Sequence, residues 1–276
     1  MGKFDNCLLA CDIDGTLVAN DYINPKNVEK IEYFMSEGGK FSVSTGRSVC
    51  AISVVLNNLK RISPSVLANG CIIYDYNKEQ IVYDNVIPFD DHYLVEKIIN
   101  SGINVGVEVH SGAQAYTVNR TELVTEHHIY EKYNSPDTLF KDATKIKWNK
   151  VICMLDSAED RTKLREYMLK DNNSTCDFVD TCAIINGQLR NYFEIVPKGV
   201  SKASSLKKLC EIMNIKDGGL FAIGDYYNDI EMLQLADISA VPCDSPEEIK
   251  ALAQYITTTC ENGAVADFID YLIKNT

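Results

Sequence analysis

Two aspartates one residue apart have the clearest capacity for chemistry in this sequence. Asp12 and Asp14 follow an apolar run from Cys7 to Cys11, and Gly15 and Thr16 come directly after them. The apolar run predicts a buried strand, and the glycine predicts that the chain leaves the strand in a loop. Ligands of open α/β sheets bind just beyond the carboxyl ends of the strands. Because neighbouring carboxylates repel unless a cation lies between them or one is protonated, the sequence predicts a metal site here.

Polar groups also follow two other predicted strands. Thr45-Gly46-Arg47 follows the strand predicted over residues 40–44, and Asp225 to Asp229 follows the strand predicted over 220–223. The carboxyl ends of parallel strands lie at one edge of a sheet, so these groups are expected to gather there. Mg²⁺ takes hard oxygen ligands and usually binds through one or two carboxylates. The predicted magnesium site has Asp12 and Asp225 as its direct carboxylate ligands, and its full set of acids is Asp12, Asp14, Asp225 and Asp229.

These groups suit the hydrolysis of a phosphate ester. The Asp12 carboxylate can attack phosphorus and form an aspartyl-phosphate, which divides one difficult hydrolysis into two easier steps. Asp14 is the candidate to protonate the leaving alkoxide and later to take a proton from water. The Lys202 ammonium and the Thr45 hydroxyl would meet the charge that builds on the phosphoryl oxygens. The predicted catalytic residues are Asp12, Asp14, Thr45 and Lys202, and the predicted phosphate-binding residues are Thr45, Gly46, Arg47, Lys202 and Asn228.

Two lysines compete for the phosphate-binding position. Lys198 lies four residues before Lys202, so both would share one face of a helix that began early. Gly199 indicates that the chain is still in a loop at Lys198. We therefore favour Lys202, with Lys198 as the alternative.

The order of strand and helix signals predicts two domains. With 276 residues, the chain exceeds the usual size of a single domain. Alternating strands and helices near both ends predict an α/β fold with a mostly parallel sheet, including a strand over residues 65–68. From about residue 85, hairpin signals and two or three helices predict a compact α+β insertion. We expect a core of residues 1–84 and 191–276 and an inserted domain of residues 85–190.

Several polar residues of the predicted insertion could contact a substrate, although no pattern distinguishes them from surface residues: Glu108, His110, Asn119 and Arg190. Glu126-His127-His128 has residue types that bind metals. Adjacent histidines point in different directions on a helix, so we expect a solvent-exposed helical turn there rather than a metal site.

The candidate residues occur in an order that resembles a known family. Asp12-Ile-Asp14-Gly-Thr, Ser44-Thr45-Gly46-Arg47, Lys202 and Gly224-Asp225-Tyr-Tyr-Asn228-Asp229 are similar to the four motifs of the haloacid dehalogenase superfamily. The likeness is greatest to its Cof-like sugar-phosphatase branch and spans the whole chain. It implies a Rossmann-like core and an α/β cap inserted between the second and third motifs. It also implies an Asp12 nucleophile, an Asp14 acid/base, phosphate binding by Thr45 and Lys202, and Mg²⁺ held by the acids of the last motif.

Composition limits the partners of the protein. The formal net charge of −12 opposes binding to nucleic acid or to anionic membranes, because both need a basic surface. Ten cysteines at irregular spacing and an N-terminus without an apolar signal segment favour a cytoplasmic protein. No apolar run approaches the length of a membrane span. The expected partner is a small phosphorylated metabolite, and the protein is expected to be a monomer or a homodimer.

The residues therefore predict a Mg²⁺-dependent phosphatase that hydrolyses a small phosphomonoester, with a sugar phosphate as the expected substrate. Two alternatives remain at this point. A phosphosugar mutase would pass the phosphoryl group to a second position and yield mainly isomer. A non-enzymatic phosphoacceptor module would use Asp12 for signalling and would need neither Asp14 as an acid nor an inserted domain.

Overall fold

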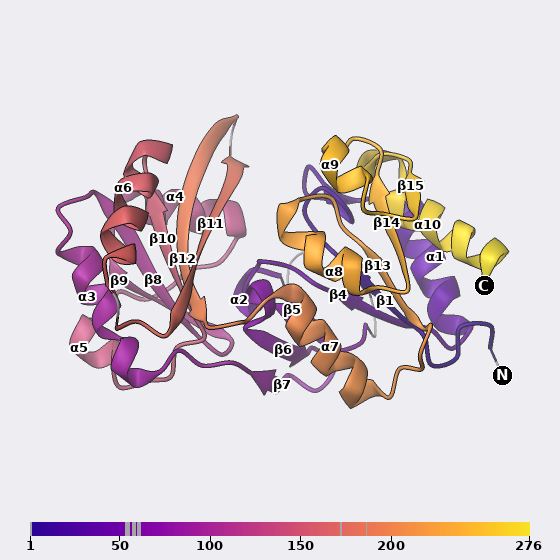
Figure 1. Cartoon of the computed structure of the whole chain (residues 1–276), viewed down its shortest axis with the longest axis horizontal. Helices are drawn as coiled ribbons and strands as arrows, with labels where there is room; N and C mark the ends of the chain where they lie inside the picture. The colour runs from indigo at the N-terminus through magenta and orange to yellow at the C-terminus, as the bar shows by residue number, and fades with distance from the viewer. Residues whose placement is uncertain (1, 53–55, 57–58, 60–61, 172, 186) are drawn as a thin grey trace. The chain divides into compact units, whose positions relative to one another are not determined.

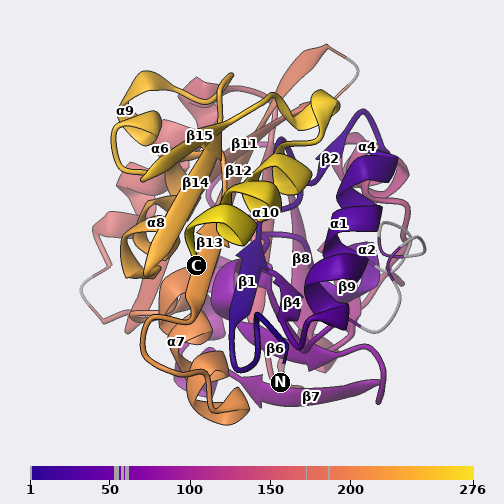
Figure 2. The same cartoon turned by 90° about the vertical axis from the view of Figure 1, so that its right-hand side faces the viewer.

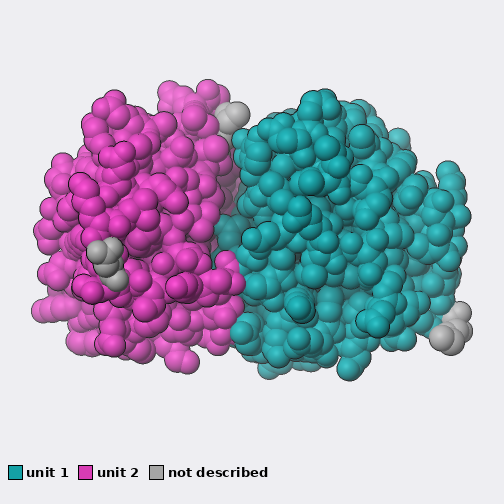
Figure 3. Space-filling model, viewed as in Figure 1, with its two compact units in different colours: residues 1–47, 55–83, 201–276 teal, residues 48–54, 84–200 magenta. Residues whose placement is uncertain are grey.

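The computed structural model describes residues 2–52, 56, 59, 62–171, 173–185 and 187–276. The chain divides into two units, coloured separately in Figure 3: unit 1 (1–47, 55–83 and 201–276) and unit 2 (48–54 and 84–200). Unit 2 runs on to Val200, past the boundary predicted at residue 190. The reason is that strand β12 (Gln188–Pro197) pairs with β10 (Lys150–Leu155) in the sheet of unit 2.

A five-stranded parallel sheet forms the centre of unit 1, with the strand order β15-β14-β13-β1-β4 (Figures 1 and 2). Strand β1 lies between β13 and β4, and all four of its residues are buried. The predicted α/β fold with a parallel sheet is confirmed. The strands are β1 (Leu8–Cys11), β4 (Lys40–Val43), β13 (Leu220–Ile223), β14 (Ile238–Pro242) and β15 (Tyr255–Thr257).

Helices cover both faces of this sheet. Leu8 and Ala10 of β1 pack in one apolar cluster with Leu206 of α7 and Met232 of α8. On the other face, α1 packs against α10, as Figure 2 shows. Helix α1 begins where Pro25 follows Asn24, whose side chain caps the helix by accepting a hydrogen bond from the backbone N–H of Lys26. The helices are α1 (Pro25–Ser36), α7 (Lys202–Met213), α8 (Ile230–Leu235), α9 (Glu247–Lys250) and α10 (Ala264–Asn275).

The strand predicted over residues 65–68 is not a member of the parallel sheet. Strand β5 (Ser65–Leu67) forms a separate three-stranded sheet with β6 (Ile72–Asp75) and β7 (Gln80–Asp84), and it meets the end of β4 through a single parallel bridge between Ser44 and Val66. Ala68 and Asn69 have positive φ angles of 52° and 56°, which turn the chain back so that β6 runs antiparallel to β5.

A small hairpin and a short helix also lie among the first 52 residues. Strands β2 (Val18–Ala19) and β3 (Tyr22–Ile23) form a small hairpin after the first aspartates. A short helix, α2 (Val49–Ile52), follows the loop after β4.

Unit 2 contains a five-stranded antiparallel sheet with the order β11-β12-β10-β8-β9. Helices α3 and α6 pack on one face around the buried Trp148, and α4 packs on the other face against β10 and β12. Strand β11 pairs continuously with β12 over its ten residues. The remaining elements are β8 (Val105–Ser111), β9 (Gln114–Asn119), β11 (Cys176–Ile185), α3 (Tyr93–Ile99), α4 (Glu122–Glu131), α5 (Phe140–Ala143) and α6 (Ala158–Leu169).

All ten cysteines are free thiols. Within the described ranges, no helix has the length and apolar character that a bilayer crossing requires.

A buried polar cluster lies between α4 and the sheet of unit 2. Glu108 is fully buried and accepts hydrogen bonds from His128 Nε2 (2.5 Å), from the Tyr133 hydroxyl (2.6 Å), and from the hydroxyls of Thr117 and Ser135. Burial alone would raise the pKa of Glu108, but the hydrogen bond from His128 and the other donors outweigh it and lower the pKa. Glu108 is therefore ionised in the folded protein.

The prediction of a solvent-exposed turn at Glu126-His127-His128 is wrong for both histidines. They lie on α4 but are only 6% and 7% exposed. Each has a buried polar partner on the adjoining elements, Glu108 for His128 and the Tyr192 hydroxyl for His127. Their burial follows from these partners, which the local sequence does not reveal.

Unit 2 should lose stability as the pH falls below 6.5. Burial lowers the pKa of His110 from 6.5 to about 4, so the unfolded chain takes up a proton at this group more readily than the folded chain does. The free energy of unfolding should therefore fall by about 2 kcal/mol between pH 6.5 and pH 5 from this group alone. Urea denaturation followed by the fluorescence of Trp148, the only tryptophan and a residue of unit 2, measures the change. His110→Gln should reduce the slope of the free energy of unfolding against pH. An unchanged slope in this variant would contradict the role of His110 in the pH dependence.

Candidate active site

Three aspartates lie together at the carboxyl end of the parallel sheet. Asp12 follows β1 and Asp225 follows β13, and these strands are neighbours in register up to Cys11 opposite Ile223. Asp229 lies in the short 3₁₀ turn after β13 (η4, Tyr227–Asp229). One carboxylate oxygen from each aspartate lies within 4.8 Å of the others. The structure thus brings together three of the four acids predicted for the metal site.

A buried lysine joins two of these acids. Lys202 is 2% exposed, and its Nζ lies 2.7 Å from Asp12 Oδ1 and 2.7 Å from Asp229 Oδ1. Lys202 is the first residue of α7, and the preceding Ser201 caps the helix through reciprocal hydrogen bonds with Ser204. Of the two candidate lysines, the structure places Lys202 among the acids, whereas Lys198 is exposed in a turn of unit 2.

The electrostatics of the cluster favour an additional cation. Burial raises the pKa of Asp12 well above its usual range; the Lys202 ammonium opposes this rise, and the charges of Asp229 and Asp225 add to it. Burial and the neighbouring Asp229 raise the pKa of Asp225 to about 7. Burial alone would lower the pKa of Lys202, but Asp12 and Asp229 outweigh it and raise the pKa. Three carboxylates therefore share one ammonium, and a divalent cation would relieve their repulsion.

The donor atoms fit Mg²⁺, with two aspartates as the best direct ligands. Asp229 has both carboxylate oxygens engaged, Oδ1 by Lys202 and Oδ2 by the backbone N–H groups of Asp225 (3.1 Å) and Tyr226 (3.2 Å). Asp229 therefore holds the lysine and the loop in place. Asp12 and Asp225 remain as carboxylates that could bind the ion directly, the number that Mg²⁺ commonly takes from a protein.

Thr16 is a member of this site that sequence reasoning did not assign. Its hydroxyl donates a hydrogen bond to Asp225 Oδ1 at 2.9 Å, so it orients a candidate metal ligand from the loop after β1. The available signal was its place in the Asp-Gly-Thr segment. Gly15 is required in the same loop, since its φ is +85° and a Cβ there would lie 2.4 Å from Asp225 Oδ2.

Gly15→Ala should damage the site more than an equivalent substitution elsewhere. We expect it to lower the free energy of unfolding by roughly 2–4 kcal/mol through backbone strain and the clash with Asp225. It should also weaken Mg²⁺ binding, as measured by calorimetric titration. Gly218→Ala is the matched control, because Gly218 has a φ of +77° but no atom within 4 Å of its Cβ position. Equal decreases in the free energy of unfolding and in Mg²⁺ binding in the two variants would show that the close approach of Gly15 to Asp225 has no importance.

Asp14 is not part of the acid cluster. Its carboxylate is exposed and forms a two-armed pair with Arg47, in which Nε donates to Oδ2 at 2.8 Å and Nη2 donates to Oδ1 at 2.7 Å. Such paired hydrogen bonds fix orientation as well as charge. The side chain of Asp14 is therefore held away from a metal position in this structure, and both of its oxygens are engaged.

The loops after β4 and β13 carry the other predicted phosphate-binding groups. Thr45 is 1% exposed, and its hydroxyl accepts a hydrogen bond from the backbone N–H of Arg47 at 3.2 Å. Gly46 passes close to Asn69, whose side-chain oxygen would lie 3.0 Å from a Cβ at this position. Asn228 is exposed in η4, the turn that also contains Asp229. All of these residues belong to unit 1.

Comparison with known proteins agrees with the motif order. The sequence profile of the haloacid dehalogenase-like hydrolases matches residues 9–269. The 5-amino-6-(5-phospho-D-ribitylamino)uracil phosphatase YitU of Bacillus subtilis is 24% identical over 95% of this chain and 96% of its own. Phosphatase YwpJ of the same organism is 23% identical over 96% of this chain and 99% of its own.

Solved structures share the fold. A haloacid dehalogenase-like hydrolase from Bacteroides thetaiotaomicron superposes with a TM-score of 0.82 at 23% identity, over 98% of this chain and 100% of the other. The subclass IIB sugar phosphatase BT4131 superposes with a TM-score of 0.80 at 20% identity, over 96% and 98% of the two chains. The predicted resemblance is confirmed, and the chain belongs to the haloacid dehalogenase-like hydrolase family.

Proposed function

We propose that this protein is a Mg²⁺-dependent phosphatase that hydrolyses a small phosphomonoester through an aspartyl-phosphate on Asp12. The expected substrate is a sugar phosphate. The observation that carries the proposal is the arrangement of Asp12, Asp225 and Asp229 around the Lys202 ammonium at the end of the sheet. The excess negative charge of this cluster suits a divalent cation, which would in turn attract the anionic oxygens of a phosphate.

The first step forms a bond between a carboxylate oxygen of Asp12 and phosphorus and breaks the bond from phosphorus to the ester oxygen. Bound Mg²⁺ would supply positive charge next to the phosphoryl oxygens. Lys202 and Thr45 bind and orient the phosphoryl group, with Gly46, Arg47 and Asn228 as further contacts. Asp14 in its protonated form gives its proton to the leaving alkoxide.

The second step returns the enzyme to its starting state. The Asp14 carboxylate takes a proton from a water molecule, whose oxygen attacks the phosphorus of the aspartyl-phosphate. The acyl phosphate bond breaks, inorganic phosphate leaves and the Asp12 carboxylate is restored. Because Arg47 holds both oxygens of Asp14 in this structure, Asp14 must exchange this pairing for contacts with the substrate before it can act as an acid.

The wider assignment follows the family. We take unit 1 as the catalytic core and unit 2 as the inserted cap domain. The named phosphatases among the relatives support phosphate-ester hydrolysis, and the particular ester is left to experiment. Ten free cysteines support a reducing compartment such as the cytoplasm.

A panel of phosphate esters assayed with Mg²⁺ and with EDTA tests this function. We expect inorganic phosphate to be released from at least one sugar phosphate with Mg²⁺, to stop with EDTA and to return when excess Mg²⁺ is added. Steady phosphate release from a single phosphosugar, without accumulation of an isomer, distinguishes hydrolysis from mutase activity. Phosphate release that EDTA does not reduce would contradict the proposed metal dependence.

A further inference from the structure

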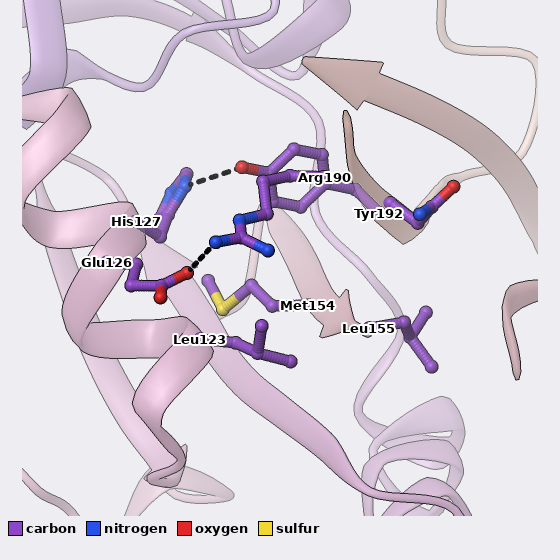
Figure 4. Close-up of a pocket in the computed structure, with 8 residues that line it drawn as sticks. Leu123, Glu126, His127, Met154, Leu155, Arg190 and Tyr192 are labelled. Atoms are coloured by element: carbon purple, nitrogen blue, oxygen red, sulfur yellow. Dashed lines mark hydrogen bonds and ion pairs between the residues drawn. The ribbon is translucent and has the colours of Figure 1, made fainter. Parts of the chain in front are cut away.

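A recess lies inside unit 2 where α4 packs against the sheet (Figure 4). Figure 4 shows Glu126 and His127 on the helix side, facing Arg190 and the ring of Tyr192 from β12. The inner part has a volume of only about 10 Å³, room for about one water molecule, and is lined by Leu123, Glu126, His127, Met154, Leu155, Arg190, Asn191 and Tyr192.

The recess widens towards solvent at the first turn of α4. The outer part shares Leu123, Glu126 and Arg190 with the inner part and has a volume of about 470 Å³. Its other lining residues are Asn104, Thr121, Glu122, Asp156 and Gln188. The outer part is thus within the size range of sites for small molecules, roughly 300–1,000 Å³.

The inner part carries no net charge. The Arg190 guanidinium is paired with the Glu126 carboxylate, with Nη2 2.6 Å from Oε2. Burial lowers the pKa of His127 to about 3, so its ring is neutral, and its Nδ1 lies 3.3 Å from the Tyr192 hydroxyl. Leu123 and its neighbours from β10 add apolar surface. A charged ligand would have to compete with one member of the ion pair for the other.

Besides Glu126 Oε2, which is ion-paired with Arg190, three buried atoms of the lining have no hydrogen-bond partner among the described residues. Nε of Arg190 is a donor, Oδ1 of Asn191 in the inner part is an acceptor, and the hydroxyl oxygen of Thr121 can donate and accept. Thr121 is the N-cap residue of α4 but makes no capping hydrogen bond with its side chain. At the entrance, the exposed carboxylates of Glu122 and Asp156 would repel an anion. The unmatched groups therefore call for a donor and an acceptor close together, without a charge.

We propose that the outer part of this recess of unit 2 binds a neutral, hydroxyl-rich small molecule, with hydroxyl groups placed on Arg190 and Thr121 and with carbon atoms against Leu123. A hydroxyl both donates and accepts, so vicinal hydroxyls satisfy Arg190 Nε and the Thr121 hydroxyl while the ion pair between Arg190 and Glu126 stays intact. Such a molecule could come from two sources. It could be the alcohol released by the proposed reaction or a separate effector.

Three six-carbon probes that differ only in one terminal group test the charge preference. Sorbitol is neutral, gluconate is an anion and glucamine is a cation. Calorimetric titration of the full chain should show saturable binding of sorbitol, with gluconate and glucamine each at least tenfold weaker. No saturable binding of sorbitol, or tighter binding of either charged probe, would overturn the proposal.

Substitutions in the recess test whether sorbitol binds there. Thr121→Val removes one hydroxyl at nearly constant volume and should weaken sorbitol binding about three- to tenfold. Arg190→Met should weaken it more than tenfold. Arg165→Met is the matched control, because Arg165 is a partly exposed arginine of unit 2 that pairs with Asp180 and does not line the recess. Trp148 fluorescence checks that each variant is folded. Sorbitol affinity that is unchanged in both recess variants would overturn the assignment.

Kinetics then separate the two sources. The released alcohol should compete with a phosphate-ester substrate, so that sorbitol raises KM and leaves kcat unchanged. An effector should change kcat in a saturable way. Either result supports a hydroxyl-binding recess. Because binding is measured without turnover, a failed phosphatase assay would count against the proposed reaction and not against the recess.

Discussion

Asp12→Asn is expected to lower kcat by about four to six orders of magnitude, because the amide cannot attack phosphorus and no aspartyl-phosphate can form. Folding should be preserved. Burial and the neighbouring acids Asp229 and Asp225 disfavour the charge of Asp12, so a neutral amide at this position should leave the melting temperature unchanged or raise it. Initial rates of phosphate release and thermal denaturation measure the two effects.

Asp217→Asn is the matched control for this variant. Asp217 is an exposed aspartate of unit 1 outside the acid cluster, and its substitution should leave kcat within a factor of two. Rapid acid quenching of the parent enzyme during turnover of a labelled ester should trap phosphate on the protein, and Asp12→Asn should trap none. Residual turnover within tenfold of the parent would exclude Asp12 as the nucleophile.

Asp14→Asn is expected to lower kcat by about 10²- to 10⁴-fold on an alkyl phosphate such as glucose 6-phosphate. The alkoxide of a sugar needs a proton as it leaves, and the amide of asparagine cannot supply one. The loss in the first step should be much smaller with p-nitrophenyl phosphate, because p-nitrophenolate leaves without protonation. Attack by water should still be slow in this variant, so phosphate should accumulate on Asp12.

The two substrates act as controls for each other in the same variant. A general decrease from misfolding or lost metal would lower kcat/KM equally for both esters, whereas loss of the acid lowers kcat/KM more for the alkyl ester, because kcat/KM reports the first step and not the shared hydrolysis of the phosphoenzyme. Unchanged turnover of both esters in Asp14→Asn would remove Asp14 from the mechanism and favour the reading of this chain as a phosphoacceptor module. Rapid-quench measurement of the phosphoenzyme level distinguishes a slow first step from a slow second one.

The strand ends of the candidate site could be predicted from the sequence because local signals mark them. Leu8–Cys11 and Leu220–Ile223 are short apolar runs that end at acids, and a strand buried on both faces needs such a run. The helix position of Lys202 was also predictable, since Gly199 keeps the preceding residues in a loop. Parallel pairing then places the carboxyl ends of the strands at one edge, which is where Asp12 and Asp225 meet.

Contacts between distant segments could not be predicted in this way. The sequence does not reveal that Arg47 forms two hydrogen bonds with Asp14, because a side-chain pair between two loops leaves no periodic pattern in the sequence. It does not show that both oxygens of Asp229 are already engaged. The buried histidines of α4 were wrongly predicted to be exposed for the same reason. A polar side chain can be buried where another segment supplies its hydrogen-bond partner. Glu108, the partner of His128, belongs to strand β8 and not to α4.

The pairing of β1 with β13 has a consequence for biosynthesis. Leu8 lies opposite Leu220, so the strand that carries Asp12 emerges from the ribosome long before one of its two neighbours exists. The continuous stretch of unit 2 from Asp84 to Val200 is complete by then and can fold while β1 still has an open edge. The acid cluster therefore cannot assemble until β13 and Asp225 have been synthesised, and a nascent chain stalled before Asp225 lacks one of the two proposed metal ligands.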